Sequence, residues 1–176
     1  MNRLSALDAS FLEVEDAVSH MHIASVAIFE GPALSRGALR GMVASKLPQV
    51  IRYRQVVRPV ALIAGRPVWV DDEHFNLDYH LRRTALPEPG GESELRLLVG
   101  RLMSQQLDRS RPLWEMWAVE GLEDGRWAVI SKVHHCMVDG VSAADLLTVM
   151  LDSEPIPAPL EDELEDWTPQ PAPSAP

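Results

Sequence analysis

Residues 114–140 read WEMWAVEGLEDGRWAVISKVHHCMVDG, and this stretch decides the predicted fold. Two runs rich in β-forming residues, Trp114–Leu122 and Arg126–His134, flank Glu123-Asp124-Gly125. An Asp-Gly pair between two such runs favours a tight turn, because these residues tolerate the positive φ that hairpin turns require. The sequence therefore predicts a β-hairpin that ends at two adjacent histidines.

Strands and helices alternate along the rest of the chain. Met21–Phe29 is apolar on both faces and predicts a buried strand. Ser35 can cap a helix whose apolar positions recur up to Leu47 and which ends before Pro48. The other predicted elements are short strands at Val68-Trp69-Val70 and from Leu77 to Ala85, a helix from about Ser93 to Leu107, and a helix beginning near Ser142. This order predicts an α/β fold, a two-layer sandwich with a mixed β-sheet.

The composition limits the class of protein. The chain has 176 residues, 46% of them hydrophobic, which suits one domain with its own core. No apolar run approaches the roughly 20 residues that a membrane-spanning helix needs, and the acidic N-terminal segment does not resemble a signal peptide. The single cysteine, Cys136, excludes an internal disulfide framework and fits a reducing compartment. We therefore expect a cytoplasmic protein.

The negative charge is concentrated near the C-terminus. The formal net charge is −10, and the last 26 residues carry seven acidic residues, no basic residue and seven of the 14 prolines. Such a segment cannot bury enough apolar surface to offset the entropy lost on ordering. We expect a folded domain over residues 1–152 and an acidic, proline-rich, disordered linker or tail over residues 153–176. An acidic chain without a basic stripe also argues against a nucleic acid partner.

The two histidines at the end of the hairpin are the strongest candidates for chemistry. Side chains alternate between the faces of a strand, so His134 and His135 should not share one role if the strand continues through both. A histidine suits general base catalysis because its ordinary pKa lies near neutral pH. Asp139 can orient an imidazole or hold the loop, and Gly140 allows a sharp turn. From these residues alone, an ordinary strand end with a helix-flanking acid is the more frequent explanation.

Other candidate residues carry weaker signals. His20 and His22 share one face of a strand, but no further histidine or cysteine cluster completes a metal site, and we expect no metal. A nucleophilic Cys136 ranks below a histidine base. The tryptophans of the hairpin fit a core better than a ligand site, and Arg52, Arg54 and Arg58 suit either a solvated strand face or an anion contact.

Read as a whole, His134-His135-Cys136-Met137-Val138-Asp139-Gly140 resembles the HHxxxDG motif of the CoA-dependent acyltransferase superfamily, whose fold is chloramphenicol acetyltransferase-like. The motif is also shared by condensation domains of peptide synthetases. Further stretches resemble the N-terminal half of the bacterial wax ester synthase/diacylglycerol acyltransferase family. They are Leu4–Leu12, Met21-His22-Ile23, Gly65–Val70, Phe75–His80 and Asp108-Arg109-Ser110-Arg111-Pro112-Leu113-Trp114-Glu115.

The resemblance implies the roles of individual residues. His135 would be the general base that deprotonates the acceptor hydroxyl, and His134 would support the site. Asp139 would be structural, orienting the loop, and Gly140 would allow the turn. Substrate-binding residues are not identified by the motif, although Pro112, Leu113 and Trp114 are candidates.

The resemblance also implies substrates and partners. The activity would be transfer of a fatty acyl group from acyl-CoA, a substrate rather than a cofactor, to diacylglycerol or a long-chain alcohol. Family members have a second, C-terminal acyltransferase domain, which would complete the active channel, so we expect this half alone to be inactive. Contact with the inner membrane face or with lipid inclusions would be peripheral. The alternatives are a non-catalytic half that binds lipid or a partner, and an enzyme similar to condensation domains.

Overall fold

The computed structural model describes residues 2–60, 65–138 and 167–171. The predicted hairpin is present: β6 (Trp114–Glu120) pairs antiparallel with β7 (Trp127–His134). A short 3-10 turn, η3 (Glu123–Gly125), joins the two strands. Asp124 and Gly125 both have positive φ, 61° and 67°, which is why an Asp-Gly pair closes this turn.

The hairpin forms the centre of a four-stranded sheet with the order β2-β7-β6-β5. Strand β2 (His22–Phe29) pairs antiparallel with β7, whereas β5 (Leu81–Ala85) pairs parallel with β6. The sheet is therefore mixed, and the predicted α/β class is confirmed. A second, antiparallel sheet has the order β1-β4-β3, formed by Asn2–Arg3, Val68–Asp71 and Gln55–Arg58.

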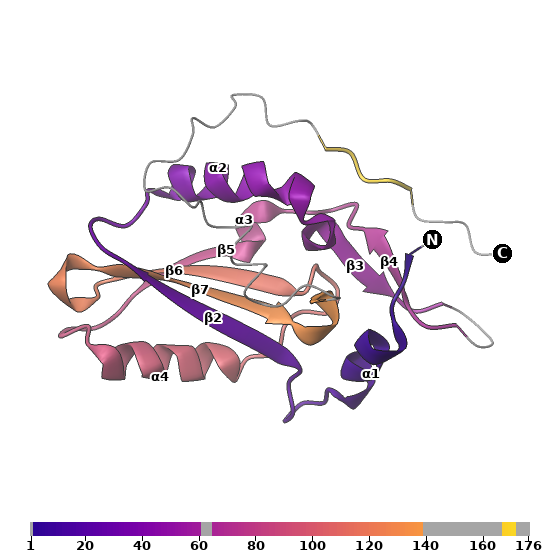
Figure 1. Cartoon of the computed structure of the whole chain (residues 1–176), viewed down its shortest axis with the longest axis horizontal. Helices are drawn as coiled ribbons and strands as arrows, with labels where there is room; N and C mark the ends of the chain where they lie inside the picture. The colour runs from indigo at the N-terminus through magenta and orange to yellow at the C-terminus, as the bar shows by residue number, and fades with distance from the viewer. Residues whose placement is uncertain (1, 61–64, 139–166, 172–176) are drawn as a thin grey trace.

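Helices cover both faces of the four-stranded sheet. Successive side chains of β7 point to opposite faces, and apolar side chains on both faces need a covering layer. Helix α2 (Arg36–Lys46) packs on the face that carries Val129, while α4 (Glu92–Met103) packs on the face that carries Ile130. Figure 1 shows α2 and α4 on opposite sides of the sheet. Helices packed on a mixed sheet are the α/β architecture that the sequence predicts.

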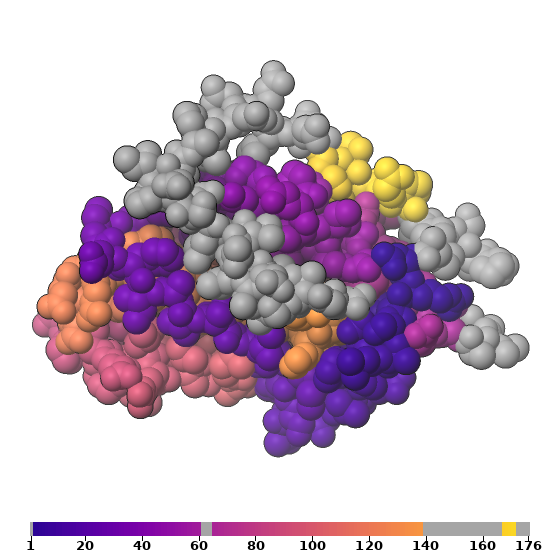
Figure 2. All heavy atoms as spheres, in the orientation of Figure 1, coloured from indigo at the N-terminus to yellow at the C-terminus, as the bar shows by residue number. Residues whose placement is uncertain are grey.

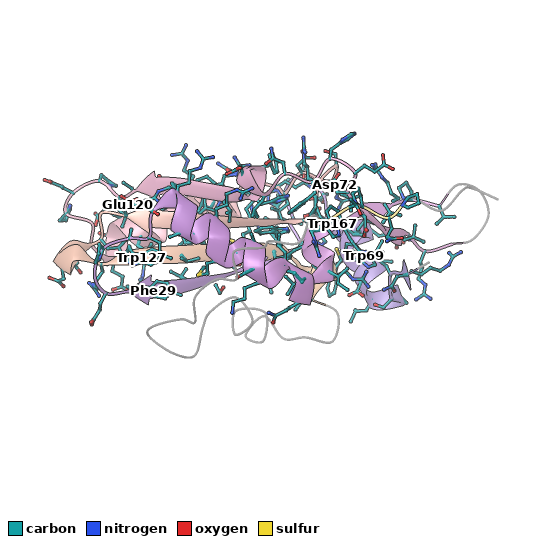
Figure 3. All side chains as sticks on the ribbon, turned by 90° about the horizontal axis from the view of Figure 1, so that it is seen from above. Phe29, Trp69, Asp72, Glu120, Trp127 and Trp167 are labelled. Carbon is teal, nitrogen blue, oxygen red and sulfur yellow. The ribbon has the colours of Figure 1, made fainter. Side chains whose placement is uncertain are left out.

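Aromatic side chains make contacts at the four-stranded sheet and at the three-stranded sheet. At one end of the four-stranded sheet, Phe29 stacks on Trp127 with ring centroids 4.7 Å apart. Figure 3 shows this pair far from Trp69 and Trp167, which lie near the three-stranded sheet. There the guanidinium of Arg54 lies 4.6 Å from the centroid of the Trp167 ring. Because residues 167–171 also include a backbone hydrogen bond from Gln170 to the Asp71 carboxylate, this part of the expected disordered tail contacts the domain.

Several predicted elements differ in their bounds or burial. The Met21–Phe29 strand is real but forms an edge of the sheet, so Ile28 is 49% exposed instead of buried on both faces. The Leu77–Ala85 stretch begins as a helical turn, α3 (Leu77–His80), capped by the Asn76 side chain. Helix α2 begins after a Ser35 cap as predicted, and α4 ends at Met103, earlier than expected.

Three short elements and one helix complete the described part of the chain. Helix α1 (Ala6–Val14) is not among the elements that the sequence predicts, although Ser5 caps it through a hydrogen bond from the Asp8 backbone N–H. The 3-10 turns are η1 (Leu47–Gln49), η2 (Ile51–Arg54) and η4 (His135–Met137). The helix predicted near Ser142 and residues 153–166 of the expected tail lie outside the described residues. No helix among the described residues is long and apolar enough to cross a bilayer.

A buried lysine connects β7 to the C-terminal end of α4. Lys132 is 1% exposed, and its Nζ donates hydrogen bonds to the carbonyl oxygens of Leu102, at 2.8 Å, and Gln105. Burial lowers the pKa of Lys132, partly offset by Glu115 and Glu15. The amine thus adds hydrogen bonds at the C-terminal end of α4, where the carbonyl oxygen of Leu102 also accepts from the Gln105 N–H.

We expect Lys132→Ala to lower the free energy of unfolding by about 2–4 kcal/mol, because it leaves a cavity and removes both hydrogen bonds that the amine donates. Urea denaturation measures this difference. Arg101→Ala, an exposed change in the same helix, should stay within about 0.5 kcal/mol of the wild type. A Lys132→Ala protein as stable as that control would show that the amine does not hold the helix end.

Candidate active site

The two adjacent histidines lie where β7 ends. His134 is the last residue of the strand, and His135 is the first residue of η4, so the strand does not continue through both. The turn, rather than strand alternation, gives the two side chains different surroundings. His134 is fully buried, whereas His135 is half-buried.

His135 is held from two sides by groups of the N-terminal segment. Its backbone N–H donates to the carbonyl oxygen of Met21 at 2.8 Å. Its imidazole stacks on Phe11 of α1, with ring centroids 4.5 Å apart and planes at 26°. Figure 2 shows the orange spheres of η4 beside the indigo spheres of the N-terminal segment, in agreement with the contact between α1 and η4. The imidazole of His135 is therefore oriented while part of the side chain stays accessible.

His134 has the environment of a neutral, buried imidazole. Its Nδ1 accepts a hydrogen bond from the backbone N–H of Cys136 at 3.1 Å, so the proton of the neutral ring is on Nε2. Burial lowers the pKa of His134 to about 4, even though the nearby Glu15 carboxylate opposes this shift. His134 is therefore neutral near pH 7, and its side chain is 0% exposed, without access to solvent.

A carboxylate and an arginine that the motif does not contain lie beside His134. The Glu15 Oε1 is 3.6 Å from His134 Nε2, and Glu15 Oε2 accepts hydrogen bonds from Arg109 Nε at 2.9 Å and Nη2 at 2.6 Å. Burial raises the pKa of Glu15, but hydrogen bonds from Arg109 and from the Met21 N–H outweigh it and leave the pKa below its ordinary value. Little in the sequence predicts this pair. Glu15 is an acid that follows an apolar segment, and Arg109 lies within the Asp108–Glu115 stretch that resembles the family.

The candidate substrate-binding residues Pro112, Leu113 and Trp114 are buried, and Leu113 and Trp114 belong to the core. Leu113 and Trp114 are each 1% exposed. The Trp114 ring stacks on Tyr53 and on His80, with centroids 4.4 Å and 4.5 Å apart, and its Nε1 donates to the carbonyl oxygen of Tyr53. The structure supports the core interpretation of Trp114, and contact of these three residues with substrate stays a prediction.

The remaining candidates divide between described and undescribed residues. Asp139 and Gly140 lie outside the described residues. Among the described residues, no group of three or more histidine, cysteine or acidic side chains is placed to hold a metal ion. His22, one of the two histidines considered for a metal site, donates a hydrogen bond from Nε2–H to the carbonyl oxygen of Met103 at 2.8 Å. Arg52 lies over the Trp69 ring and donates to Gln55, so it has partners other than an anion.

Cys136 is unsuited to nucleophilic catalysis. The residue is 0% exposed, and burial raises the pKa of its thiol to about 12. Since the thiolate is the reactive form, a thiol in this position stays unreactive near neutral pH.

We expect the Cys136 thiol to react with Ellman's reagent only after denaturation, and Cys136→Ala to leave the activity of the full-length protein unchanged. Absorbance at the reagent's product band, with and without denaturant, measures the first expectation. Rapid labelling of the native protein, or loss of activity in a folded Cys136→Ala variant, would indicate a thiol mechanism.

Comparison with known proteins shows the family. Residues 4–175 match the model of the wax ester synthase/diacylglycerol acyltransferase catalytic domain. Two Mycobacterium tuberculosis proteins named as probable diacylglycerol O-acyltransferases are similar: tgs1 is 45% identical over 154 residues, and tgs3 is 42% identical over 172 residues. The alignments cover 86% and 97% of this chain but 33% and 63% of those relatives.

Solved structures agree in fold. The wax ester synthase/diacylglycerol acyltransferase from Marinobacter aquaeolei VT8 is 35% identical with a TM-score of 0.72, covering 94% of this chain and 42% of that one. The starter condensation domain of rhizomide synthetase, at 13% identity and a TM-score of 0.64, covers 85% of this chain and shows the shared fold alone. This chain therefore belongs to the wax ester synthase/diacylglycerol acyltransferase catalytic domain family.

Proposed function

We propose that this chain is part of an O-acyltransferase that transfers a fatty acyl group from acyl-CoA to the hydroxyl of diacylglycerol or a long-chain alcohol. The observation that carries the proposal is His135, a half-buried imidazole oriented by Phe11 and Met21 in a chain of this family. The names of the similar proteins support diacylglycerol or wax alcohol as the acceptor.

In this proposal His135 is the general base. It takes the proton of the acceptor hydroxyl, and the hydroxyl oxygen attacks the thioester carbonyl carbon of acyl-CoA. The resulting tetrahedral oxyanion collapses, the carbon–sulfur bond breaks, and the CoA thiolate receives the proton from the His135 imidazolium. The products are an ester and free CoA, and no covalent enzyme intermediate, cofactor or metal takes part.

The neighbouring motif residues have supporting roles. His134, buried and neutral, packs under the turn that presents His135. The proposed role of Asp139 is to orient the loop, and that of Gly140 is to allow the chain to turn. These two roles come from the family resemblance.

A second domain completes the site in this proposal. The chain spans between a third and 63% of the length of the similar mycobacterial proteins. We propose that a C-terminal acyltransferase domain supplies the remaining wall of the channel, and that the present half alone has little activity. Any membrane or lipid-inclusion contact is peripheral, at the cytoplasmic face.

The acceptor and donor classes are tested on the full-length protein. Labelled palmitoyl-CoA is offered with diacylglycerol, with hexadecanol, or with an amine acceptor, and a carrier-protein thioester replaces the CoA donor in a parallel series. We expect ester formation from acyl-CoA with one or both hydroxyl acceptors. Transfer only from the carrier protein would support a condensation-type reaction, and binding without transfer would support a non-catalytic half.

A further inference from the structure

We propose that Glu15, held by Arg109, is a positioning residue for His135. The inference rests on the proposed function, in which His135 is the general base. Glu15 and Arg109 are 94 positions apart in sequence, and neither belongs to the HHxxxDG motif. Together they hold the groups that contact His135.

The carboxylate itself is fixed in one place. The Glu15 side chain is 1% exposed, and the Arg109 side chain is 44% exposed. Arg109 donates two charge-assisted hydrogen bonds to the one oxygen Glu15 Oε2, from Nε at 2.9 Å and from Nη2 at 2.6 Å. Glu15 Oε1 is left to face the end of β7.

One connection to His135 runs through the backbone of Met21. Glu15 Oε1 accepts a hydrogen bond from the Met21 N–H at 3.1 Å. The carbonyl oxygen of the same residue accepts the backbone N–H of His135 at 2.8 Å. The carboxylate therefore holds the residue to which the backbone of the candidate base is bonded.

A second connection runs through His134. Glu15 Oε1 lies 3.6 Å from His134 Nε2, the nitrogen that carries the proton because Nδ1 accepts the Cys136 N–H. The protonated nitrogen of His134 thus lies near a negative charge, at a distance longer than a hydrogen bond. This attraction favours one orientation of the ring that lies directly before His135 in the chain.

A third connection runs through α1. Besides Glu15, Arg109 Nη2 donates to the carbonyl oxygen of Leu12 at 2.8 Å. Leu12 follows Phe11, whose ring stacks on the His135 imidazole. Arg109 therefore links the carboxylate to the helix turn that orients the base.

These three connections predict a kinetic effect beyond stability. The Arg109 side chain is 44% exposed, and an ion pair that water can reach usually contributes only about 0–1 kcal/mol, so stability alone explains the arrangement poorly. Displacing a catalytic group by about 1 Å can cost about 10²-fold in rate. Loosening Glu15 should therefore lower kcat while substrate binding is preserved.

The test compares full-length wild-type protein with Glu15→Ala, Glu15→Gln and Glu13→Gln. Glu13 is an exposed carboxylate in α1, two positions away, and serves as the matched control. We expect Glu15→Ala to lower kcat about 10²-fold with little change in KM for acyl-CoA. Glu15→Gln keeps an oxygen for the Met21 N–H and should recover part of the rate, and Glu13→Gln should match the wild type.

Amide hydrogen exchange provides a readout that does not depend on activity. In a Glu15→Ala protein that stays folded, we expect faster exchange at His135, bonded to Met21, while the middle of β7 keeps its protection. Unchanged exchange at His135, or an unchanged kcat in folded Glu15→Ala, would overturn the inference. Uniformly faster exchange throughout β7 would also overturn it, in favour of a general stabilising role. If the wild type transfers no acyl group, the proposed function fails, and the exchange comparison still decides whether Glu15 holds His135.

Discussion

Replacing His135 by alanine should lower kcat/KM for acyl transfer by about 10²- to 10⁴-fold in the full-length protein, the range that a general base contributes. Without the imidazole, no described group near the turn can take its place: His134 is buried and neutral, and the thiol of Cys136 is buried and protonated. The loss should appear mainly in kcat, because His135 acts on the proton transferred in the reaction rather than on the acyl chain.

The controls for this prediction are a test of folding and a change at another histidine. His135 is half-buried, so His135→Ala should fold, as circular dichroism and thermal denaturation can verify. The exposed His74, changed to alanine, should keep full activity. A folded His135→Ala protein that retains substantial turnover would remove His135 from its role.

Replacing Trp114 by alanine should lower the free energy of unfolding by about 3–5 kcal/mol, the cost of removing a large aromatic side chain from a core. The ring is 1% exposed and lies against both Tyr53 and His80, so its removal leaves two aromatic surfaces without contact. The hydrogen bond from Nε1 to the Tyr53 carbonyl is lost as well. Such a loss is a large fraction of the stability of one domain.

Trp114→Phe separates packing from substrate binding. Phenylalanine keeps most of the stacking and loses the hydrogen bond, so we expect an intermediate loss of stability, measured by urea denaturation, and an unchanged KM. A stable Trp114→Phe protein with a strongly raised KM would instead support the substrate contact inferred from the family resemblance. Stability of Trp114→Ala equal to that of the wild type would contradict the core assignment.

Local patterns in the sequence predicted the centre of the fold. The Asp124-Gly125 pair and two β-rich runs were sufficient for the hairpin, and Ser35 marked the start of α2. The burial of β2 was predicted wrongly, because an apolar strand at a sheet edge has the same residues as one in the middle. Strand order depends on pairings between distant segments, which periodicity does not contain.

The same distinction applies to the candidate site. His134 and His135 are adjacent, so a short motif contains them. The family, predicted from that motif together with stretches such as Leu4–Leu12 and Pro112-Leu113-Trp114, is shown by comparison. The residues that surround the two histidines come from distant parts of the sequence. Phe11 and Glu15 lie more than 100 positions upstream, and Arg109 lies before β6. Only the folded chain brings these side chains to the end of β7, and no composition or spacing rule predicted that contact.

Acyl transfer with stoichiometric release of CoA tests the central claim most directly. The full-length protein is mixed with labelled acyl-CoA in the presence and absence of diacylglycerol or hexadecanol, and labelled ester and free thiol are measured in the same samples. We predict that ester and CoA appear in equal amounts, only when a hydroxyl acceptor is present, and that His135→Ala nearly abolishes both. Equal ester formation by the folded His135→Ala protein would contradict the account.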